Sequence, residues 1–536
     1  MGLWASYFFA KCFLYVWGAI PLDAPANLLF AVWLLLPTPA RLARFRSVAA
    51  IRTVVTVIAA LLLLWHDSWL PPLTVAAAFV RDGGLPSPGF ILQFLAGAVE
   101  PWVVGGLALL VAACALIRRH VRLTPVVFLA LGLVLVSDHG RPREEMDRYV
   151  ASFYAEESGR RVDLGVTPDP SDIDVVILHV CSLSWDDLAA VGMTEDPFFD
   201  RFDYLFTSFN SVTSHSNPAA IRLLRAGCGQ PPHDALYRPA AGECYVLDAL
   251  RAAGYRTSFA LNHDGRYGGF ADEVRRLGHA DVEMGTSDLP VRQTDFDGSA
   301  IHGDAAVLER WWALRQRTGV PRAALYYNTI TLHDGGHRVG DDRWWTRDRV
   351  EHYRAATRAL FHDVTAFAAL MEASGRRGVV VFVPEHGMAL RGSAIQPAGL
   401  REVPLPQITT VPVGVRLVGP GWRRGGRPSR PALVAEPTSY LALARLLADL
   451  LGRPALDLDE AGAARIAADL PRTAFLAENQ TARVVRRGSD YFAKARSSGA
   501  GWTKLAADAA SKPPGAGGGP SSTVTIVTEG YGAQHD

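Results

Sequence analysis

The chain has 536 residues, which is enough for two or three domains. Its formal net charge of +1 argues against a nucleic-acid-binding protein, which would carry a basic patch or stripe. Hydrophobic residues make up 49% of the sequence, and their excess over polar residues is concentrated in the first 138 residues, which indicates a membrane-attached globular protein.

Five hydrophobic segments in these 138 residues predict a transmembrane region. Each is shorter than the roughly 20 residues that a perpendicular membrane helix needs, so flanking Trp, Tyr and Arg must complete the spans. A buried helical domain of a soluble protein is the alternative for any one segment, but five in succession disfavour it. The segments are Leu3–Ile20, Ala24–Pro37, Ala49–Trp65, Trp102–Ile117 and Leu123–Ser137.

Arginines between the segments predict the orientation of this region. One group lies between the second and third segments and another between the fourth and fifth, so both loops face the same side. The positive-inside rule makes that side the cytoplasm, and five crossings then place everything after residue 137 outside it. The arginines are Arg41, Arg44, Arg46 and Arg52, followed by Arg118, Arg119 and Arg122.

Two further features belong to the membrane region. Lys11 interrupts the first segment and must either snorkel to the membrane surface or pair within the bundle. The apolar stretch Phe90–Val99 is expected to form a helix that lies on the outer leaflet.

Cysteine usage agrees with an extracytoplasmic domain. Cys12 and Cys114 lie in membrane segments. Cys228 and Cys244 are close in sequence and flank turn-forming residues, and an oxidising compartment favours a disulfide between them. Cys181 then remains as a free thiol, for which metal ligation is a good explanation.

Beyond the membrane region, residues 139–172 form a charged, Pro- and Ser-containing linker with one short helix near Met146–Glu157. Strand-like and helix-like runs alternate from 173 to 480, which predicts an α/β domain with a doubly wound, mostly parallel sheet. Residues 481–536 form a C-terminal extension, expected to be largely disordered after residue 507. Expected strands are Asp174–Val180, Tyr204–Phe209, Arg256–Leu261, Ala323–Thr331, Val379–Pro384 and Thr410–Leu417, and expected helices are Pro218–Ala226, Tyr245–Ala253, Phe270–Leu277, Gly303–Arg317, Arg347–Ala373 and Ser439–Leu451.

Polar side chains follow several of these strands at the point where each strand ends. Glu385 and His386 come directly after one buried strand, and Cys181 follows another. Open α/β sheets bind their ligands at this carboxyl edge. A small polar loop also places Ser216 near the start of a helix, whose N-terminus favours an anion such as phosphate.

Cys, Glu, His and a Ser hydroxyl form a mixed ligand set that suits Zn²⁺ best among the common metals. A zinc-bound hydroxyl loses its proton readily, which makes Ser216 a candidate nucleophile. The strand that ends near Thr331 adds His333 and His337, four residues apart. Each feature alone has a structural explanation, as a capped strand end, a helix cap, a small buried side chain or a loop histidine. Four such features at one sheet edge favour a metal-binding site.

Five strings in the chain are long and unusual: 65–71, 181–185, 218–226, 332–335 and 384–387. In these strings, and from the membrane region to about residue 475, the chain resembles the membrane-bound phosphoethanolamine transferases of bacterial cellulose synthesis, the BcsG type. That family belongs to the alkaline phosphatase/sulfatase superfamily. The resemblance implies an alkaline-phosphatase-like fold for residues 173–480.

The resemblance also implies roles for individual residues. One Zn²⁺ is expected between four ligands, of which the serine is also the nucleophile, and two further residues are expected to contact the phosphoryl group. The ligands are Cys181, Ser216, Glu385 and His386, the phosphoryl contacts are His333 and Arg401, and the disulfide joins Cys228 and Cys244. The chain departs from the family at His215, commonly aromatic, and at Asn217, commonly Gly, so these two residues and His337 are candidate substrate contacts.

The implied reaction moves phosphoethanolamine from phosphatidylethanolamine to the glucose O6 hydroxyl of nascent cellulose, through a covalent intermediate on Ser216. The implied setting is the bacterial inner membrane, with the catalytic domain in the periplasm and cellulose synthase subunits as partners. One alternative is transfer of phosphoethanolamine or phosphoglycerol to lipid A or another envelope glycan. Enzymes of those groups typically use Thr as nucleophile and a carboxylate where Cys181 stands. The other alternative is a non-catalytic membrane subunit of the cellulose synthase complex, which the intact ligand set disfavours.

Overall fold

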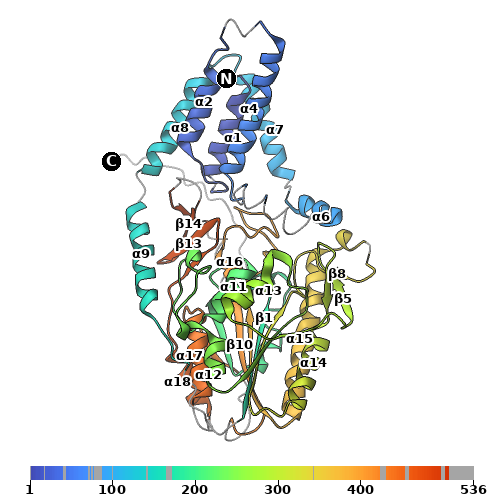
Figure 1. Cartoon of the computed structure of the whole chain (residues 1–536). Helices are drawn as coiled ribbons and strands as arrows, with labels where there is room; N and C mark the ends of the chain where they lie inside the picture. Colours follow the sequence, from blue (N-terminus) through green and yellow to red (C-terminus); the bar gives the residue numbers. More distant parts are fainter. Residues whose placement is uncertain are drawn as a thin grey trace, which may run out of the picture.

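The structure, a computed structural model, describes residues 2–16, 18–39, 44–70, 73, 77, 87–98, 101–139, 143–164, 172–341, 343–422, 430–452, 458–496 and 501–505. Arg41, the linker stretch 165–171 and the tail after residue 507 lie outside the described residues. Figure 1 shows a helical bundle on one side of a larger α/β domain.

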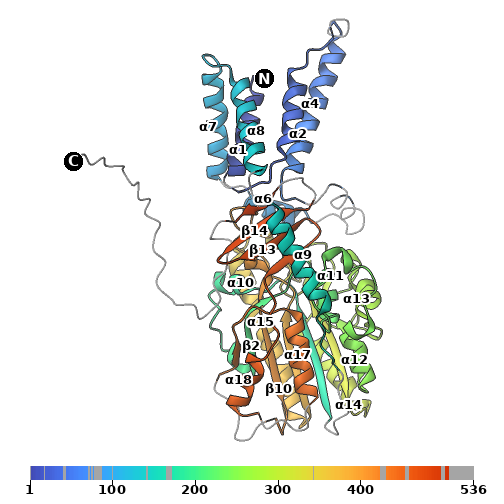
Figure 2. The ribbon, with the colours of Figure 1, turned by 90° about the vertical axis from the view of Figure 1, so that its left-hand side faces the viewer.

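The bundle consists of helices that coincide with the five predicted apolar segments (Figures 1 and 2). Helix α1 packs against α7 and α8, and α2 packs against α4 and α8. Within the described part of the chain, α4 alone is long and apolar enough to cross a membrane by itself, while α2, α7 and α8 are apolar but shorter. The bounds are α1 (Trp4–Val16), α2 (Ala24–Leu35), α4 (Arg46–His66), α7 (Pro101–Ile117) and α8 (Leu123–His139).

Lys11 is buried and paired inside this bundle. Its Nζ lies 2.5 Å from Asp67 Oδ2 and donates a hydrogen bond to Asn27 Oδ1 at 2.9 Å. The Asn27 amide in turn donates to Asp67 Oδ2 at 2.5 Å. Lys11 therefore pairs within the bundle and does not snorkel to the membrane surface. This pair joins α1, α2 and the residue after α4.

Helix α6 (Pro88–Ala98) lies between the bundle and the α/β domain (Figure 1). Ile91 and Leu92 are exposed on it. Phe90 faces the α/β domain, where its ring centroid lies 5.5 Å from that of Phe296. The helix matches the stretch from residue 90 that was predicted to lie on the membrane surface.

Eight strands form the central sheet of the α/β domain, in the order β11-β2-β10-β9-β1-β7-β3-β4. Every neighbouring pair is parallel except the two that involve β10, which is antiparallel to β9 and β2. The prediction of a mostly parallel sheet is therefore confirmed. The bounds are β1 (Ile173–Val180), β2 (Tyr204–Asn210), β3 (Arg256–Leu261), β4 (Glu283–Met284), β7 (Ala323–Thr329), β9 (Arg377–Pro384), β10 (Thr410–Val418) and β11 (Ala432–Val434).

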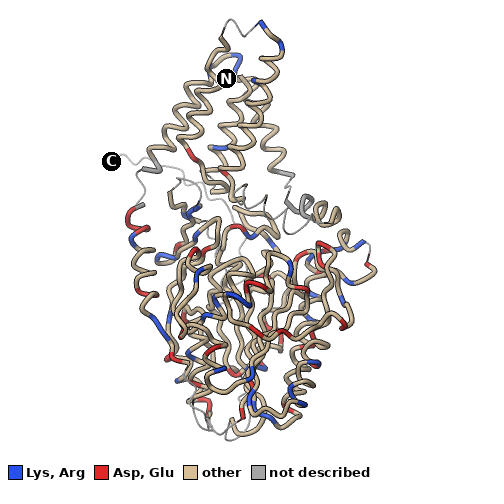
Figure 3. Tube along the Cα trace, viewed as in Figure 1, with Lys and Arg blue, Asp and Glu red and all other residues tan. Residues whose placement is uncertain are grey.

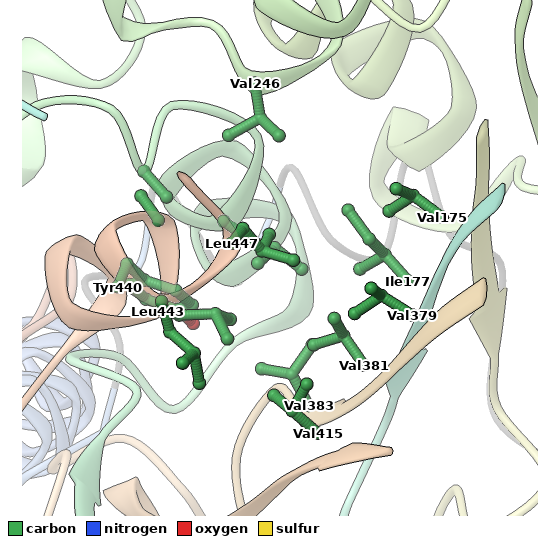
Figure 4. Close-up of a cluster of buried hydrophobic side chains, with 14 of the residues drawn as sticks. Val175, Ile177, Val246, Val379, Val381, Val383, Val415, Tyr440, Leu443 and Leu447 are labelled. Carbon is green, nitrogen blue, oxygen red and sulfur yellow. The ribbon is translucent and has the colours of Figure 1, made fainter. Parts of the chain in front are cut away.

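Strand β9 shows why the central strands are continuously apolar. Successive side chains point to opposite faces of a strand, and both faces of this sheet are covered by helices. Val379 and Val381 point toward the side of α17 and α12 (Figure 4). Val380 and Phe382 pack on the opposite side, in the core that includes α14 and α15. A strand buried on both faces is therefore apolar along most of its length.

The six predicted helices of this domain are all present, and several short ones were not predicted. The α-helices are α10 (Trp185–Ala190), α11 (Ser216–Leu224), α12 (Val246–Ala252), α13 (Phe270–Gly278), α14 (Asp304–Arg317), α15 (Arg349–Ala373), α16 (Pro406–Thr409), α17 (Tyr440–Leu451) and α18 (Glu460–Ala468). The 3-10 helices are η1 (Phe199–Arg201), η2 (His233–Ala235), η3 (Gly242–Cys244), η4 (Tyr267–Gly269) and η5 (Trp344–Thr346).

Two smaller antiparallel sheets complete the domain, and neither was predicted. The strands β12 to β15 form a meander, which packs against the linker helix α9 (Arg143–Gly159). The expected boundary between residues 480 and 481 falls between two paired strands of this meander. The strands are β12 (Leu476–Glu478), β13 (Ala482–Arg487), β14 (Asp490–Ala495) and β15 (Thr503–Lys504), and the second sheet contains β5 (Val291–Thr294), β6 (Ala300–His302) and β8 (His337–Arg338).

A buried ion pair near the amino end of β1 generates a prediction about stability. Asp174 accepts hydrogen bonds from Arg315 Nε at 2.9 Å and from Arg376 Nε at 3.0 Å, and both Asp174 and Arg315 are buried. Asp174→Asn leaves a buried guanidinium without its counter-charge, which costs about 3–5 kcal/mol. We expect a clearly lower melting temperature for the purified full-length variant. Asp288→Asn removes an exposed partner of Arg310 and is the control, expected to melt like the wild type. Equal melting temperatures for both variants would contradict this account.

Candidate active site

The sheet register brings the predicted strand-end residues together. Val180, the last residue of β1, pairs with Pro384 on one side and with Thr329 on the other. Cys181 therefore follows β1 at the position where Glu385 follows β9. The carboxyl ends of three parallel strands meet here, as expected for a ligand site in an open α/β sheet.

Four side chains converge at this edge. Cys181 Sγ lies 3.6 Å from Ser216 Oγ, and Ser216 Oγ lies 3.4 Å from His386 Nε2. His386 Nε2 lies 3.6 Å from Glu385 Oε2. Ligand atoms of the cysteine, the glutamate and this histidine all lie within 4.8 Å of one another. These three residues are fully buried, whereas the serine is half-buried, so the serine faces the opening.

The cluster fits a tetrahedral metal ion. Zinc bonds to nitrogen, oxygen and sulfur imply ligand-to-ligand separations of about 3.3–3.6 Å, close to those found here. Glu385 Oε2 is buried and has no hydrogen-bond partner. A buried carboxylate oxygen without a partner is costly. A cation between these side chains would complete its coordination.

The electrostatics of the cluster agree with this fit. Burial, together with the nearby Glu385 carboxylate, raises the pKa of Cys181 to about 12. Burial likewise raises the pKa of Glu385. Burial, with repulsion from Arg401, lowers the pKa of His386. A thiolate and a carboxylate can both be ionised in this place only next to a positive charge.

Hydrogen bonds behind the cluster orient the ligand atoms. Asn328 Nδ2 donates to Glu385 Oε1 at 2.5 Å, which leaves Oε2 turned toward the cluster. His386 Nδ1 lies 3.0 Å from the Gly387 carbonyl oxygen. In the tautomer that donates to this carbonyl, Nδ1 carries the proton and Nε2 keeps its lone pair for a metal. Sequence reasoning missed Asn328, although a polar residue inside an apolar strand was a usable signal.

The loop after His386 is fixed from α10. The buried Asp187 carboxylate accepts the backbone N–H groups of Met388 at 2.7 Å and Leu390 at 3.0 Å. A Cβ on Gly387 would lie 2.5 Å from Ser184 Oγ, so only glycine allows this approach. The contact between α10 and this loop helps to hold two ligands of the cluster in place: Cys181, which precedes α10, and His386, which precedes the loop.

The backbone is strained around the cluster. Ser182, directly after Cys181, has a φ of 65°, and Ala389 has a φ of 58°. Val212, four residues before Ser216, has a φ of 70°, which is a genuine outlier for a β-branched residue. Such conformations concentrate at functional sites, where the surrounding structure enforces them.

Ser216 is the first residue of α11, as the sequence predicted for a residue near a helix N-terminus. Backbone N–H groups at this end of the helix have no partner within the helix, and the helix dipole favours negative charge there. The Ser216 hydroxyl therefore lies between the other three residues of the cluster and the N-terminus of α11, which suits a phosphoryl oxygen.

Arg401 lies beside the cluster, and His333 is close enough to affect the pKa values of Glu385 and His386 through its charge. His333 Nδ1 is 3.0 Å from Asp295 Oδ1. Burial lowers the pKa of His333, but the Asp295 carboxylate outweighs burial, so the pKa is raised overall. Arg401 Nη1 donates to Ser182 Oγ at 3.1 Å and lies 3.2 Å from His386 Nδ1. Asp295 was missed because it lies in the connection between two short, unpredicted strands.

Two of the three further candidates have their side chains engaged elsewhere. Asn217 Nδ2 donates to the Gly268 carbonyl at 2.8 Å and to Glu273 Oε2 at 2.9 Å. His337 stacks on Trp344, with a distance of 4.7 Å between ring centroids. The third, His215, remains beside the nucleophile.

The disulfide prediction is confirmed. Cys228 and Cys244 form a disulfide with a Cα–Cα distance of 4.9 Å. The bridge joins the segment after α11 to η3, just before α12. Cys12, Cys114 and Cys181 are free thiols.

A hollow opens to solvent beside His333. It is lined by the loop that follows β7, by the start of α15, and by Gln93 of α6. The helix between the bundle and the α/β domain therefore forms one wall of the space next to the site.

Comparison with protein families gives two adjacent matches. Residues 137–502 match the model described as the "Cellulose biosynthesis protein BcsG C-terminal domain", and residues 4–136 match the model of the N-terminal domain of the same protein. The two matches meet between residues 136 and 137, at the end of α8.

Individual proteins are similar over nearly the full length. The cellulose biosynthesis protein BcsG of Escherichia coli (strain K12) is 32% identical, over 90% of this chain and 92% of that protein. Its counterpart in Salmonella typhimurium is 33% identical, over 91% and 94%. Among solved structures, the lipooligosaccharide phosphoethanolamine transferase A of Neisseria meningitidis has 14% identity and a TM-score of 0.43, over 87% of this chain and 99% of that one.

Proposed function

The chain belongs to the BcsG family of cellulose biosynthesis proteins, and we propose that it is a zinc-dependent phosphoethanolamine transferase. The donor is phosphatidylethanolamine and the acceptor is the O6 hydroxyl of glucose in cellulose. One observation carries the proposal: Ser216 Oγ lies 3.6 Å from Cys181 Sγ and 3.4 Å from His386 Nε2, at a helix N-terminus and open to solvent on one side.

In the first step, Ser216 Oγ, whose proton has already passed to bulk water, attacks the phosphorus of the lipid, and the bond from phosphorus to the diacylglycerol oxygen breaks. The leaving oxygen takes a proton from His333, which acts as general acid. In the second step, His333 takes the proton from the glucose O6 hydroxyl, O6 attacks the phosphorus, and the bond to Ser216 breaks. A Zn²⁺ ion bound by the four-residue cluster would lower the pKa of the Ser216 hydroxyl.

Charge on the phosphoryl oxygens is balanced by this chain's own groups. Arg401 presents its guanidinium beside His386, and the N–H groups at the start of α11 lie at the end of the helix that carries Ser216. Donors that are fixed in advance stabilise developing charge strongly in a partly buried site, because they need no reorganisation during the reaction.

The membrane arrangement forms part of the proposal. Five helices within residues 1–138 cross the inner membrane, residues 139–172 link them to a periplasmic catalytic domain at 173–480, and residues 481–536 follow as an extension. Leu29, Leu61, Leu109 and Leu129 are exposed on the bundle, where lipid would cover them. Basic residues lie at the end of the bundle remote from the α/β domain (Figure 3), which supports a cytoplasmic location for that end. The disulfide suits an oxidising periplasm, and cellulose synthase subunits are the expected partners.

The central test is the covalent intermediate. Purified full-length protein incubated with phosphatidylethanolamine vesicles is expected to gain a phosphoethanolamine adduct, located on Ser216 by peptide mass analysis. In Ser216→Ala the adduct disappears and transfer falls by at least about 10³-fold, because the nucleophile is lost. Ser158→Ala, on the exposed surface of α9, is the control and is expected to keep both the adduct and the transfer activity. Transfer that persists in Ser216→Ala would refute the mechanism.

Zinc content tests the ligand set. Wild-type protein is expected to carry about one zinc per chain, as in a mononuclear site with four protein ligands. Cys181→Ala removes the sulfur ligand, so we expect its zinc content to fall far below the wild-type value. Cys114→Ala, within α7, is the matched cysteine control and keeps its zinc. The measurement is elemental analysis after dialysis against a weak chelator, and an unchanged content in Cys181→Ala would contradict the assignment.

Asp295→Asn tests the role of His333 through pH. A general acid must be protonated, and Asp295 raises the pKa of His333, which keeps the acid form present to higher pH. Removing this carboxylate lowers the pKa of His333, so the alkaline fall in kcat is expected to move to lower pH. Asp334 also favours the protonated ring, and Arg401 opposes it. Asp297→Asn, exposed and two residues away, is the control. An alkaline limb that stays in place would exclude His333 as the acid.

A further inference from the structure

Glu402 is a largely buried carboxylate beside the site to which the mechanism gives no role. Its side chain is 16% exposed, and Oε2 is buried without a hydrogen-bond partner. The nearest basic nitrogen is His215 Nε2, 3.9 Å from Oε1, which is beyond hydrogen-bond distance. Among the described residues, no arginine or lysine forms an ion pair with this carboxylate within 4.0 Å. Burial raises the pKa of Glu402 to about 7, although Arg401 acts in the opposite direction.

The position of Glu402 relative to the nucleophile is fixed by hydrogen bonds. Ser214 Oγ donates to the Arg401 carbonyl at 2.6 Å, two residues before Ser216. Asn479 Nδ2 donates to the Glu402 carbonyl at 2.9 Å and to Ser214 Oγ at 3.0 Å. The nucleophile loop and the Arg401–Glu402 segment are thus joined to the same residue of the meander. The backbone that carries Glu402 is thus fixed beside the loop that carries Ser216, while its carboxylate oxygen Oε2 stays without a protein partner.

The charges on phosphoethanolamine match this arrangement. A two-carbon arm separates its phosphoryl group from its ammonium group, and Arg401 and Glu402 are adjacent in the chain. Arg401 and the start of α11 suit the phosphoryl group. An ammonium group has three donors and a positive charge, and it would satisfy the oxygen that now lacks a partner.

We propose that Glu402 binds the ammonium group of the ethanolamine headgroup and is a specificity-determining residue of the transferase. The proposal rests on the proposed function. A headgroup with a hydroxyl in place of the ammonium leaves the buried carboxylate without a counter-charge. Sites built to pair with a polar substrate group discriminate strongly against analogues that lack it.

The test compares two chromogenic diesters with the same leaving group. One is p-nitrophenyl phosphoethanolamine, and the other is p-nitrophenyl 2-hydroxyethyl phosphate, in which a hydroxyl replaces the ammonium. Purified full-length wild type is expected to prefer the ammonium diester in kcat/KM. Glu402→Gln is expected to lose roughly 10- to 100-fold on the ammonium diester, the range for a hydrogen bond to a charged group. The hydroxyl diester should change by less than about threefold, since it never had the charged contact.

Control variants and zinc content make the result specific. Glu436→Gln, an exposed glutamate beside Arg472, should behave as wild type on both diesters. Glu402→Asp keeps the negative charge and should keep the preference for the ammonium diester. Zinc content should stay at the wild-type value in all three variants, because Glu402 lies outside the ligand cluster. Cleavage of the hydroxyl diester shows in each case that the variant is folded.

Three outcomes would overturn the proposal. Equal losses on both diesters in Glu402→Gln would mean that Glu402 only supports the loop. A wild type that cleaves both diesters without preference would exclude headgroup selection while leaving the transferase function intact. A wild type that cleaves neither would refute the proposed function itself, and the role of Glu402 with it.

Discussion

A thiol, a carboxyl group and an imidazole are buried together at the carboxyl edge of the sheet, and this burial is the constraint around which the site is built. Burial raises the pKa of both Cys181 and Glu385, and one oxygen of the glutamate has no partner. Neighbouring parts of the fold keep the ligands from relaxing: Asn328 holds one glutamate oxygen, and Asp187 holds the loop after His386. The strained residues around the cluster belong to the same scaffold, since rigid packing must enforce such conformations.

The same logic of paired charges applies in the helical bundle. Lys11 and Asp67 are both buried, and Asn27 completes their hydrogen bonds, so three helical segments are joined through one polar contact. A charged side chain that lacks its partner is costly in an apolar surrounding. Helix α6 follows in the chain and ends up next to the hollow beside His333. Helix α6 is therefore one contact between the apolar bundle and the α/β domain, and Trp69, which packs in one cluster with Ala389 and Val403, is another.

Sequence patterns predicted the parts of the fold that depend on local composition. The central strands were found because burial on both faces demands continuous apolar runs, and Cys181, Glu385 and His386 were found because polar residues end such runs. Asp295, Glu402 and Asn479 were missed because they come from loops and from a meander whose short strands have no clear period. Their place at the site depends on contacts between segments far apart in the chain. His337 was a candidate substrate contact, yet its ring stacks on Trp344, since residues four apart in a loop, such as His333 and His337, do not share a face as they do in a helix.

The contact between Asn479 and Ser214 spans 265 residues of sequence. At typical synthesis rates of about 5–20 residues per second, the second of these residues emerges tens of seconds after the first. The serine, cysteine and histidine segments can fold into their strands and helices in that interval, but the loop that carries the nucleophile stays without its anchor. Assembly of the site is thus a late event in the life of each molecule, completed only when nearly the whole chain has been made.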